Sequence, residues 1–273
     1  MAVTILDIRD AARNAGLSGH PVCVHASLRS FGWVEGGAQA VVEGLLAEGC
    51  TVLVLTLSFM FSSPPPPGRR LAQNGVNYER YTGQPINAGP VYSPDTQEVE
   101  RGMVGAVPAA VVAMPLRVRG NHPRDSFTAI GPLASQLIAG QSPQDVYAPL
   151  RALAQADGFV VLMGVGLDKM TLLHLAEQQA GRNPFRRWAN GADGQPVEVE
   201  EGGCSGGFAQ MEPVLSPLMS TIRAGQSLWR VFPAKATLEA ASESLRCNPM
   251  ITHCGDMACA ECEDAVLGGP VVT

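Results

Sequence analysis

The 273-residue sequence has little charge, no basic excess and no long apolar run, and each shortage excludes a class of protein. Charged residues make up 16% of the chain, and the formal net charge is −6. Nucleic-acid binding needs a basic surface for the phosphates, so this composition argues against such a partner. No stretch approaches the roughly 20 consecutive apolar residues that span a membrane. We therefore expect no nucleic-acid partner and no membrane partner.

Residues 1–10 also lack the basic segment followed by an apolar one that marks a signal peptide, so we expect a cytoplasmic protein. Hydrophobic residues make up 46% of the chain, which is typical of a globular fold with a sizeable core. There is no internal repeat. We expect a single domain over residues 1–273, in which the chain from about residue 190 could form a subordinate lobe.

Short apolar runs alternate with helical patterns along the first two thirds of the chain. Runs typical of buried strands lie at 22–24, 51–56, 116–119, 126–130 and 160–163, and helical patterns lie at 4–16, 38–47, 102–114 and 150–156. This alternation predicts an α/β fold: a central mixed β-sheet flanked by helices, with functional loops at strand ends and a smaller C-terminal lobe. The Pro- and Gly-rich residues 62–98 interrupt it and predict a long loop beside a substrate cleft, with a rigid linker as the alternative.

The segment from Gly164 to Glu177 carries the most informative pattern for chemistry. A Gly-x-Gly turn leads from a buried strand into a helix on which His174 and Glu177 stand three residues apart, so both project from one face. An imidazole can move a proton near neutral pH, and a nearby carboxylate can fix its tautomer and raise its basicity. A helix with His and Glu on its surface is common, so this pattern alone leaves a structural histidine as the simpler interpretation.

Two further histidines lie in distinctive segments. His25 begins a His-x-Ser-Leu-x-x-x-Gly pattern, and Arg119 begins an Arg-x-x-His-Pro-x-x-Ser-Phe pattern around His122. With the His174 segment and the late Cys-x-x-Cys pair, these motifs follow one another at intervals that resemble those of the aminoglycoside 3-N-acetyltransferase family. The resemblance covers nearly the whole chain.

The resemblance implies that the chain transfers an acetyl group from acetyl-CoA to the 3-amino group of the 2-deoxystreptamine ring of an aminoglycoside, a reaction that confers resistance. An amine is mostly protonated at neutral pH, so the transfer needs a base. We assign this role to His174, with Glu177 or Asp168 orienting its ring, and we predict His25 as a second polar group at the reacting centre. A thioester is already activated, so direct transfer without a covalent enzyme intermediate is the simplest mechanism.

The resemblance also implies that the turn after the first strand binds coenzyme A. Such a turn offers N–H and hydroxyl groups to phosphates, and Arg29 adds a positive charge, although a plain helix cap is the alternative. The predicted contacts to acetyl-CoA are Ser27, Leu28, Arg29, Ser30, Thr56, Ser58 and Ser126. The predicted carboxylate contacts to the small-molecule aminoglycoside are Asp95, Asp125, Asp168 and Glu177, against the usual role of Asp in turns.

Two departures from the family pattern remove polar groups near the predicted site. Ala109 stands where Glu commonly follows Gly-x-x-Pro, and Met170 stands where Asn often precedes Thr171. These changes leave room for a different acceptor with the same chemistry, such as an amine in biosynthesis. The sequence makes no prediction of oligomeric state.

The seven cysteines give a separate signal. Cys259 and Cys262 have the Cys-x-x-Cys spacing of zinc ligands, and Cys247, Cys254 and His253 lie close by in the sequence. Structural zinc sites usually show two tight pairs, whereas Cys247 and Cys254 are far apart. The sequence therefore favours reduced thiols packed in a terminal lobe and no metal. A zinc-binding interaction protein, in which the histidines are structural, remains an alternative of a different class.

Overall fold

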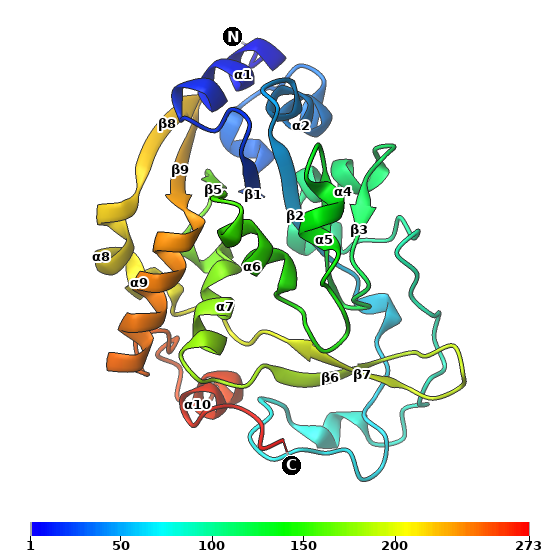
Figure 1. Ribbon diagram of the computed structural model, residues 1–273. Helices are drawn as coiled ribbons and strands as arrows, with labels where there is room; N and C mark the ends of the chain where they lie inside the picture. The colour runs from blue at the N-terminus through cyan, green and yellow to red at the C-terminus, as the bar shows by residue number, and fades with distance from the viewer. Residues whose placement is uncertain (1, 273) are drawn as a thin grey trace.

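The computed structural model describes residues 2–272 as a central β-sheet with helices on both faces (Figure 1). Seven strands form this sheet in the order β3-β4-β2-β1-β5-β9-β8, and β6 pairs with β7 in a separate hairpin. The strands are β1 Pro21–Ala26, β2 Thr51–Leu57, β3 Val118–Arg119, β4 Asp125–Ile130, β5 Phe159–Met163, β6 Phe185–Ala189, β7 Val197–Glu201, β8 Ser220–Ala224 and β9 Ser227–Pro233. The α-helices are α1 Ile5–Asn14, α2 Gly37–Ala47, α3 Arg101–Val104, α4 Ala106–Ala113, α5 Ala134–Ile138, α6 Ala148–Gln155, α7 Leu172–Gln179, α8 Glu212–Leu215, α9 Ala234–Cys247 and α10 Ala260–Val266.

The middle of the sheet is parallel and its two sides are antiparallel. β1 pairs in parallel with both β2 and β5, whereas β4 joins β2 and β9 joins β5 in antiparallel fashion. The predicted α/β fold with a central mixed sheet flanked by helices is therefore confirmed.

Alternating side chains divide the core into two clusters, one on each face of the sheet. Cys23 of β1 belongs to the cluster that includes residues of α5, α6, α7 and α9, whereas its neighbours Val22 and Val24 belong to the cluster with α1, α2 and α4. This follows from the two-residue period of a strand, which sends successive side chains to opposite faces. Because both faces are covered, the central strands β1, β2 and β5 are mostly apolar.

Local signals account for several element ends. Thr4 caps α1 in a capping box with Asp7, whose N–H donates to Thr4 Oγ1 over 3.3 Å. The expected helix over 102–114 is divided into α3 and α4, because Gly105 has a φ of +83° that a continuous helix does not allow. The expected strand at 116–119 shortens to β3, since Leu116 has a φ of +65°.

Residues 62–98 form a long segment whose regular helical structure is a short 3₁₀ helix at Tyr78–Tyr81. In Figure 1 this cyan segment runs beside the β6–β7 hairpin and α10. The side chain of Asn74 accepts from Arg186 N–H over 2.7 Å, and Gly75 N–H donates to Asp264 Oδ2 over 2.7 Å. These bonds attach the segment to β6 and α10.

The last third of the chain contributes to the central sheet. β9 pairs with β5, β8 pairs with β9, and α9 packs against α7. In residues 2–272 no helix has both the length and the apolar character needed to cross a membrane.

Candidate active site

A cavity of about 880 Å³ opens at the C-terminal ends of the parallel strands. β1 lies at the centre of the sheet, with β2 on one side and β5 on the other. The segments that follow these parallel strands therefore leave the sheet in different directions near the end of β1. In open α/β sheets such a switch point is where ligands bind. His25 of β1, Leu57 of β2 and Val165 after β5 all line the cavity, whose volume suits a small-molecule site.

His174 of α7 faces this cavity with one ring nitrogen bound and the other open. Its Nδ1 lies 2.9 Å from Glu177 Oε2, and Nε2 has no hydrogen-bond partner among residues 2–272. An ionised carboxylate only accepts, so Nδ1 carries the hydrogen and the neutral ring presents Nε2 as an acceptor. The ring packs between Tyr147 and Phe208, at centroid distances of 6.3 and 4.7 Å. A ring held in this way has a fixed tautomer and can accept a proton at Nε2.

Glu177 is itself held by two groups. Thr252 Oγ1 donates to Glu177 Oε1 over 2.8 Å, and the guanidinium of Arg182 pairs with the same oxygen. Asp168, the other predicted partner of His174, lies 3.0 Å from Lys169 Nζ and does not contact the imidazole. The geometry thus favours Glu177 as the group that orients the ring.

Two glycines allow the close approach of segments around the site. A Cβ on Gly164, which has a φ of +68°, would lie 2.2 Å from the side chain of Ser30, so the turn after β1 packs directly on the turn after β5. A Cβ on Gly202 would lie 2.6 Å from Tyr147 Oη and 2.9 Å from His174 Cδ2. Both positions need glycine for steric reasons.

The turn after β1 brings part of the predicted coenzyme A site to the cavity. Ser27, Leu28 and Arg29 line it, together with His25. Burial lowers the pKa of His25 to about 4, so this ring is neutral at pH 7. Ser30 does not line the cavity, because its hydroxyl donates to Ser27 O over 2.7 Å and lies 2.8 Å from Ser227 Oγ.

Three other predicted coenzyme A contacts lie inside the protein, away from the cavity. Thr56 and Ser126 are fully buried and share a hydrogen bond of 2.9 Å between β2 and β4. Ser58 Oγ donates to Pro123 O over 2.9 Å. These hydroxyls bond within the sheet and the next turn and do not line the cavity, so their contact with the cofactor stays a prediction. Asp95 is exposed and does not line the cavity either, and its contact with the substrate stays a prediction.

Asp125, in contrast, lines the cavity at the start of β4. It is 7% exposed, and its Oδ1 has no hydrogen-bond partner within the described chain. Burial raises the pKa of Asp125 well above its usual range, and the nearby carboxylate of Glu201 raises it further. The guanidinium groups of Arg124 and Arg187 lower this pKa, but they do not offset the effect of burial.

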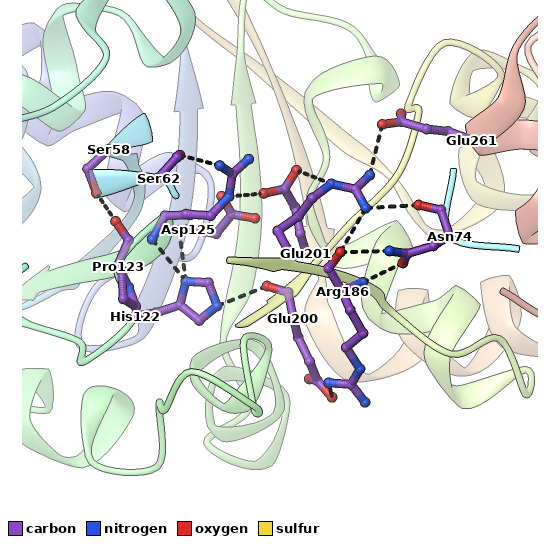
Figure 2. Close-up of polar contacts among 12 residues, drawn as sticks. Ser58, Ser62, Asn74, His122, Pro123, Asp125, Arg186, Glu200, Glu201 and Glu261 are labelled. Atoms are coloured by element: carbon purple, nitrogen blue, oxygen red, sulfur yellow. Dashed lines mark hydrogen bonds and ion pairs between the residues drawn. The ribbon is translucent and has the colours of Figure 1, made fainter. Parts of the chain in front are cut away.

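Glu201 and Glu261 complete an acidic wall beside Asp125 (Figure 2). Burial opposes ionisation of Glu201, but the guanidinium groups of Arg124 and Arg187 together outweigh it and hold the pKa of Glu201 below its ordinary value. Glu261 lies 3.4 Å from Arg187, and burial raises its pKa. Neither glutamate is among the contacts predicted from the sequence, because β7 and α10 lie far from the histidine motifs along the chain.

His122 has a structural role in this wall. Its Nδ1 accepts from Asp125 N–H over 2.8 Å and its Nε2 lies 2.9 Å from Glu200 O, so both nitrogens are bound to backbone (Figure 2). Burial lowers the pKa of His122 to about 4. The ring fixes the backbone that presents Asp125.

Positive charge also lines the cavity. Arg29 and Arg101 of α3 are both exposed, and neither forms an ion pair within residues 2–272. Arg101 is not among the contacts predicted from the sequence. Lys169 is the third cation. Arg182, Arg186 and Arg187, by comparison, pair with carboxylates.

Comparison with known proteins agrees with this arrangement. The model of the family described as aminoglycoside 3-N-acetyltransferase matches residues 23–246. Aminoglycoside N(3)-acetyltransferase VIII of Streptomyces fradiae is 34% identical over 202 residues, and enzyme IX of Micromonospora chalcea is 32% identical over 183 residues. The matches cover 70% and 65% of this chain but only 65% and 63% of those relatives.

The fold similarity extends further along the chain. The structure of aminoglycoside acetyltransferase AAC(3)-IVa matches with a TM-score of 0.74 and 25% identity over 98% of both chains. A histidine-to-alanine mutant of that enzyme has been solved in complex with a gentamicin. The resemblance expected from the histidine motifs is confirmed by these matches. Since the family model matches most of the chain, including most of the segments that build the cavity, this protein belongs to the aminoglycoside 3-N-acetyltransferase family.

Proposed function

We propose that this protein acts in the cytoplasm, where it acetylates the 3-amino group of the 2-deoxystreptamine ring of aminoglycosides with acetyl-CoA and so confers resistance. The observation that carries the proposal is the open Nε2 of His174 at a cavity lined by both carboxylates and cations. The curated relatives are aminoglycoside N(3)-acetyltransferases, which supports the same reaction class.

The cavity suits a long, phosphate-bearing cosubstrate. Arg29, Arg101 and Lys169 offer positive charge to phosphates, and Ser27 and Leu28 form the turn at the end of β1. When bound, acetyl-CoA supplies an activated acetyl group with a thiolate leaving group. The residues around it need only position the reactants and move a proton.

The acidic wall suits a polycationic acceptor. An aminoglycoside carries several ammonium groups, and within residues 2–272 Asp125 has a buried oxygen without a hydrogen-bond partner, which an ammonium could satisfy. Glu201 and Glu261 add negative charge on the same cavity. The complex of the related AAC(3)-IVa mutant with a gentamicin supports this acceptor class.

His174 is the base in the proposed reaction. Its Nε2 takes the proton of the attacking amine, and the carboxylate of Glu177 at Nδ1 stabilises the imidazolium that forms. His25 stays neutral at pH 7 and serves as a hydrogen-bonding group at the end of β1. Direct transfer is the simplest mechanism, because a thioester needs no further activation by an enzyme nucleophile.

The test is release of free thiol from acetyl-CoA with a panel of aminoglycosides. We compare wild type with His174→Ala, and we use His20→Ala as a matched control because His20 packs on Phe159 and does not line the cavity. We expect turnover for wild type and His20→Ala, and a loss of at least about 100-fold in kcat for His174→Ala with coenzyme A binding retained.

Two results would reject the proposal at different levels. Coenzyme A binding without thiol release for any aminoglycoside would retain the acetyltransferase chemistry but point to another amine as acceptor. Absence of coenzyme A binding would reject the acetyl-CoA site itself.

A further inference from the structure

Four cysteine thiols meet beside the active-site cavity. Cys204 comes from the loop after β7, and Cys254, Cys259 and Cys262 come from the C-terminal segment. Their four sulfur atoms all lie within 4.8 Å of one another. In residues 2–272 they are the one group of three or more His, Cys, Asp or Glu side chains with such spacing that could hold a metal. The convergence joins parts of the chain that lie far apart in the sequence.

The set differs from the one that the sequence brings together. Cys247 lies at the exposed end of α9 and is not in the cluster, and Cys204 takes its place. His253 is also unavailable, because its Nδ1 accepts from Gly255 N–H over 3.0 Å and its Nε2 lies 3.0 Å from Glu263. The ligand set is therefore four thiols and no imidazole.

The spacing fits a tetrahedral metal–thiolate site. Zinc–sulfur bonds of about 2.3 Å place the four sulfurs about 3.8 Å apart in a tetrahedron, so the thiols need to approach by at most about 1 Å. Cys204 and Cys254 lie in loops, and side-chain rotation can supply this shift. Soft thiolates select zinc over the hard cations magnesium and calcium, and four protein ligands leave no open position for catalysis.

The surrounding backbone also suits thiolates. Gly206 N–H points to Cys204 Sγ over 3.3 Å, and Cys254 N–H points to Cys262 Sγ over 3.4 Å. Amide donors of this kind stabilise negative sulfur around metal sites. Cys259 is the N-cap of α10, so the Cys-x-x-Cys pair lies at the start of that helix.

We propose that Cys204, Cys254, Cys259 and Cys262 bind one structural zinc ion that joins the loop after β7 to the C-terminal segment. Because four protein ligands fill the coordination sphere, the site is separate from the acetyl-transfer chemistry. Zinc takes no part in that reaction.

The joined segments reach the proposed base from two sides. Gly202 lies against the ring of His174, and Thr252 donates to Glu177 Oε1 over 2.8 Å. Glu261, which lies between Cys259 and Cys262 in the sequence, forms part of the acidic wall. Loss of zinc therefore loosens both the groups that orient His174 and one wall of the cavity, a consequence that rests on the proposed function of His174.

The first test is metal analysis of the full chain purified under reducing conditions. We expect about one equivalent of zinc per chain, and below about 0.1 equivalent in Cys204→Ala and Cys259→Ala. Cys247→Ala is the matched control, since it removes an exposed cysteine outside the cluster, and it should keep the metal. Replacement of zinc by cobalt(II) should give the strong visible and thiolate charge-transfer bands of a tetrahedral thiolate site.

A second measurement on wild type serves if the cysteine variants do not fold. Titration of thiols with an organomercurial should release one zinc as four thiols react. Wild-type protein without zinc, with all seven thiols reacting in the native state, would overturn the proposal. A mass lowered by the hydrogens of two disulfides would overturn it as well. These readouts do not depend on acetyl transfer, so they separate failure of the zinc site from failure of the proposed function.

Discussion

Two histidines, His174 on α7 and His122 in the turn before β4, differ in what the second ring nitrogen contacts. The ring of His174 is held through Nδ1 by Glu177, lines the cavity, and has no hydrogen-bond partner at Nε2 among residues 2–272. The ring of His122 is bound to backbone through both nitrogens and does not line the cavity. Both histidines lie in distinctive segments of the sequence, although the base is predicted only at His174. The comparison teaches that a histidine is available for catalysis only when one nitrogen is left unbound at a cavity.

The largest expected difference between the two histidines concerns stability. His122→Asn removes two buried hydrogen bonds to backbone and should lower the free energy of unfolding by about 3 kcal/mol at pH 7.5. The pKa of His122 is about 4 in the folded protein against an ordinary value of 6.5. The neutral ring therefore contributes its full stabilisation to the free energy of unfolding of wild type above pH 6.5, and this stabilisation is lost as the pH falls toward 4.

This gives a pH signature for urea unfolding. The gap between wild type and His122→Asn should narrow by about 2 kcal/mol between pH 7.5 and pH 5, since the unfolded ring is protonated first. A gap that is the same at both pH values would show that His122 is not buried in its neutral form.

The next effect sharpens the account of His174. Glu177→Gln keeps an acceptor near Nδ1 but removes the charge that stabilises the imidazolium, so kcat should fall about 30-fold with little change in either KM. Glu243→Gln, at an exposed glutamate of α9, is the matched control for steady-state kinetics. A larger loss in Asp168→Asn than in Glu177→Gln would assign the orienting role to Asp168 instead.

The wall that His122 supports gives the third effect. Asp125→Asn removes the buried charge proposed to meet an ammonium, so the KM for the aminoglycoside should rise about 10-fold. The folded pKa of Asp125 is raised, so its ionisation costs stability above the unfolded value, and the amide should not lower the urea midpoint at pH 7. Asp95→Asn, on the exposed segment, should leave KM unchanged. An unchanged KM in Asp125→Asn would remove it from the acceptor site.

The smallest effect concerns the cosubstrate side of the cavity. Arg29→Ala should raise the KM for acetyl-CoA about 5-fold at low salt, and the difference should shrink as ionic strength rises, because the arginine is exposed. Arg70→Ala removes an exposed arginine of the 62–98 segment and serves as control. Equal KM values for the two variants would contradict a phosphate contact at Arg29.

Much of the fold could be predicted because its signals are local. The apolar strands β1, β2 and β5 and the capped helix α1 each lie within a short window of sequence. The sequence does not predict β8 and β9, since their polar and apolar residues alternate weakly and they join the sheet beside β5 from a distant part of the chain. Pairing over such a distance depends on packing, which a sequence pattern does not encode.

In the candidate site, too, the sequence predicts residues that are close together along the chain but not contacts between distant segments. His174 and Glu177 are three residues apart on one helix, and the sequence alone brings them together. Thr56 and Ser126 look like ligand contacts in the sequence, but the antiparallel pairing of β2 with β4 turns their hydroxyls toward each other. Glu201 and Cys204 could not be placed, because their neighbours in space come from distant parts of the chain.

The most direct test of this account is a paired measurement on His174→Gln and His122→Gln, with kcat for acetyl transfer and the urea midpoint determined for each. We expect His174→Gln to lose kcat by about 100-fold or more and to unfold at the same urea concentration as wild type. His122→Gln should unfold at a lower urea concentration and retain its kcat per folded molecule. A His174→Gln protein that keeps its kcat within about 3-fold of wild type would contradict the assignment of His174 as the base.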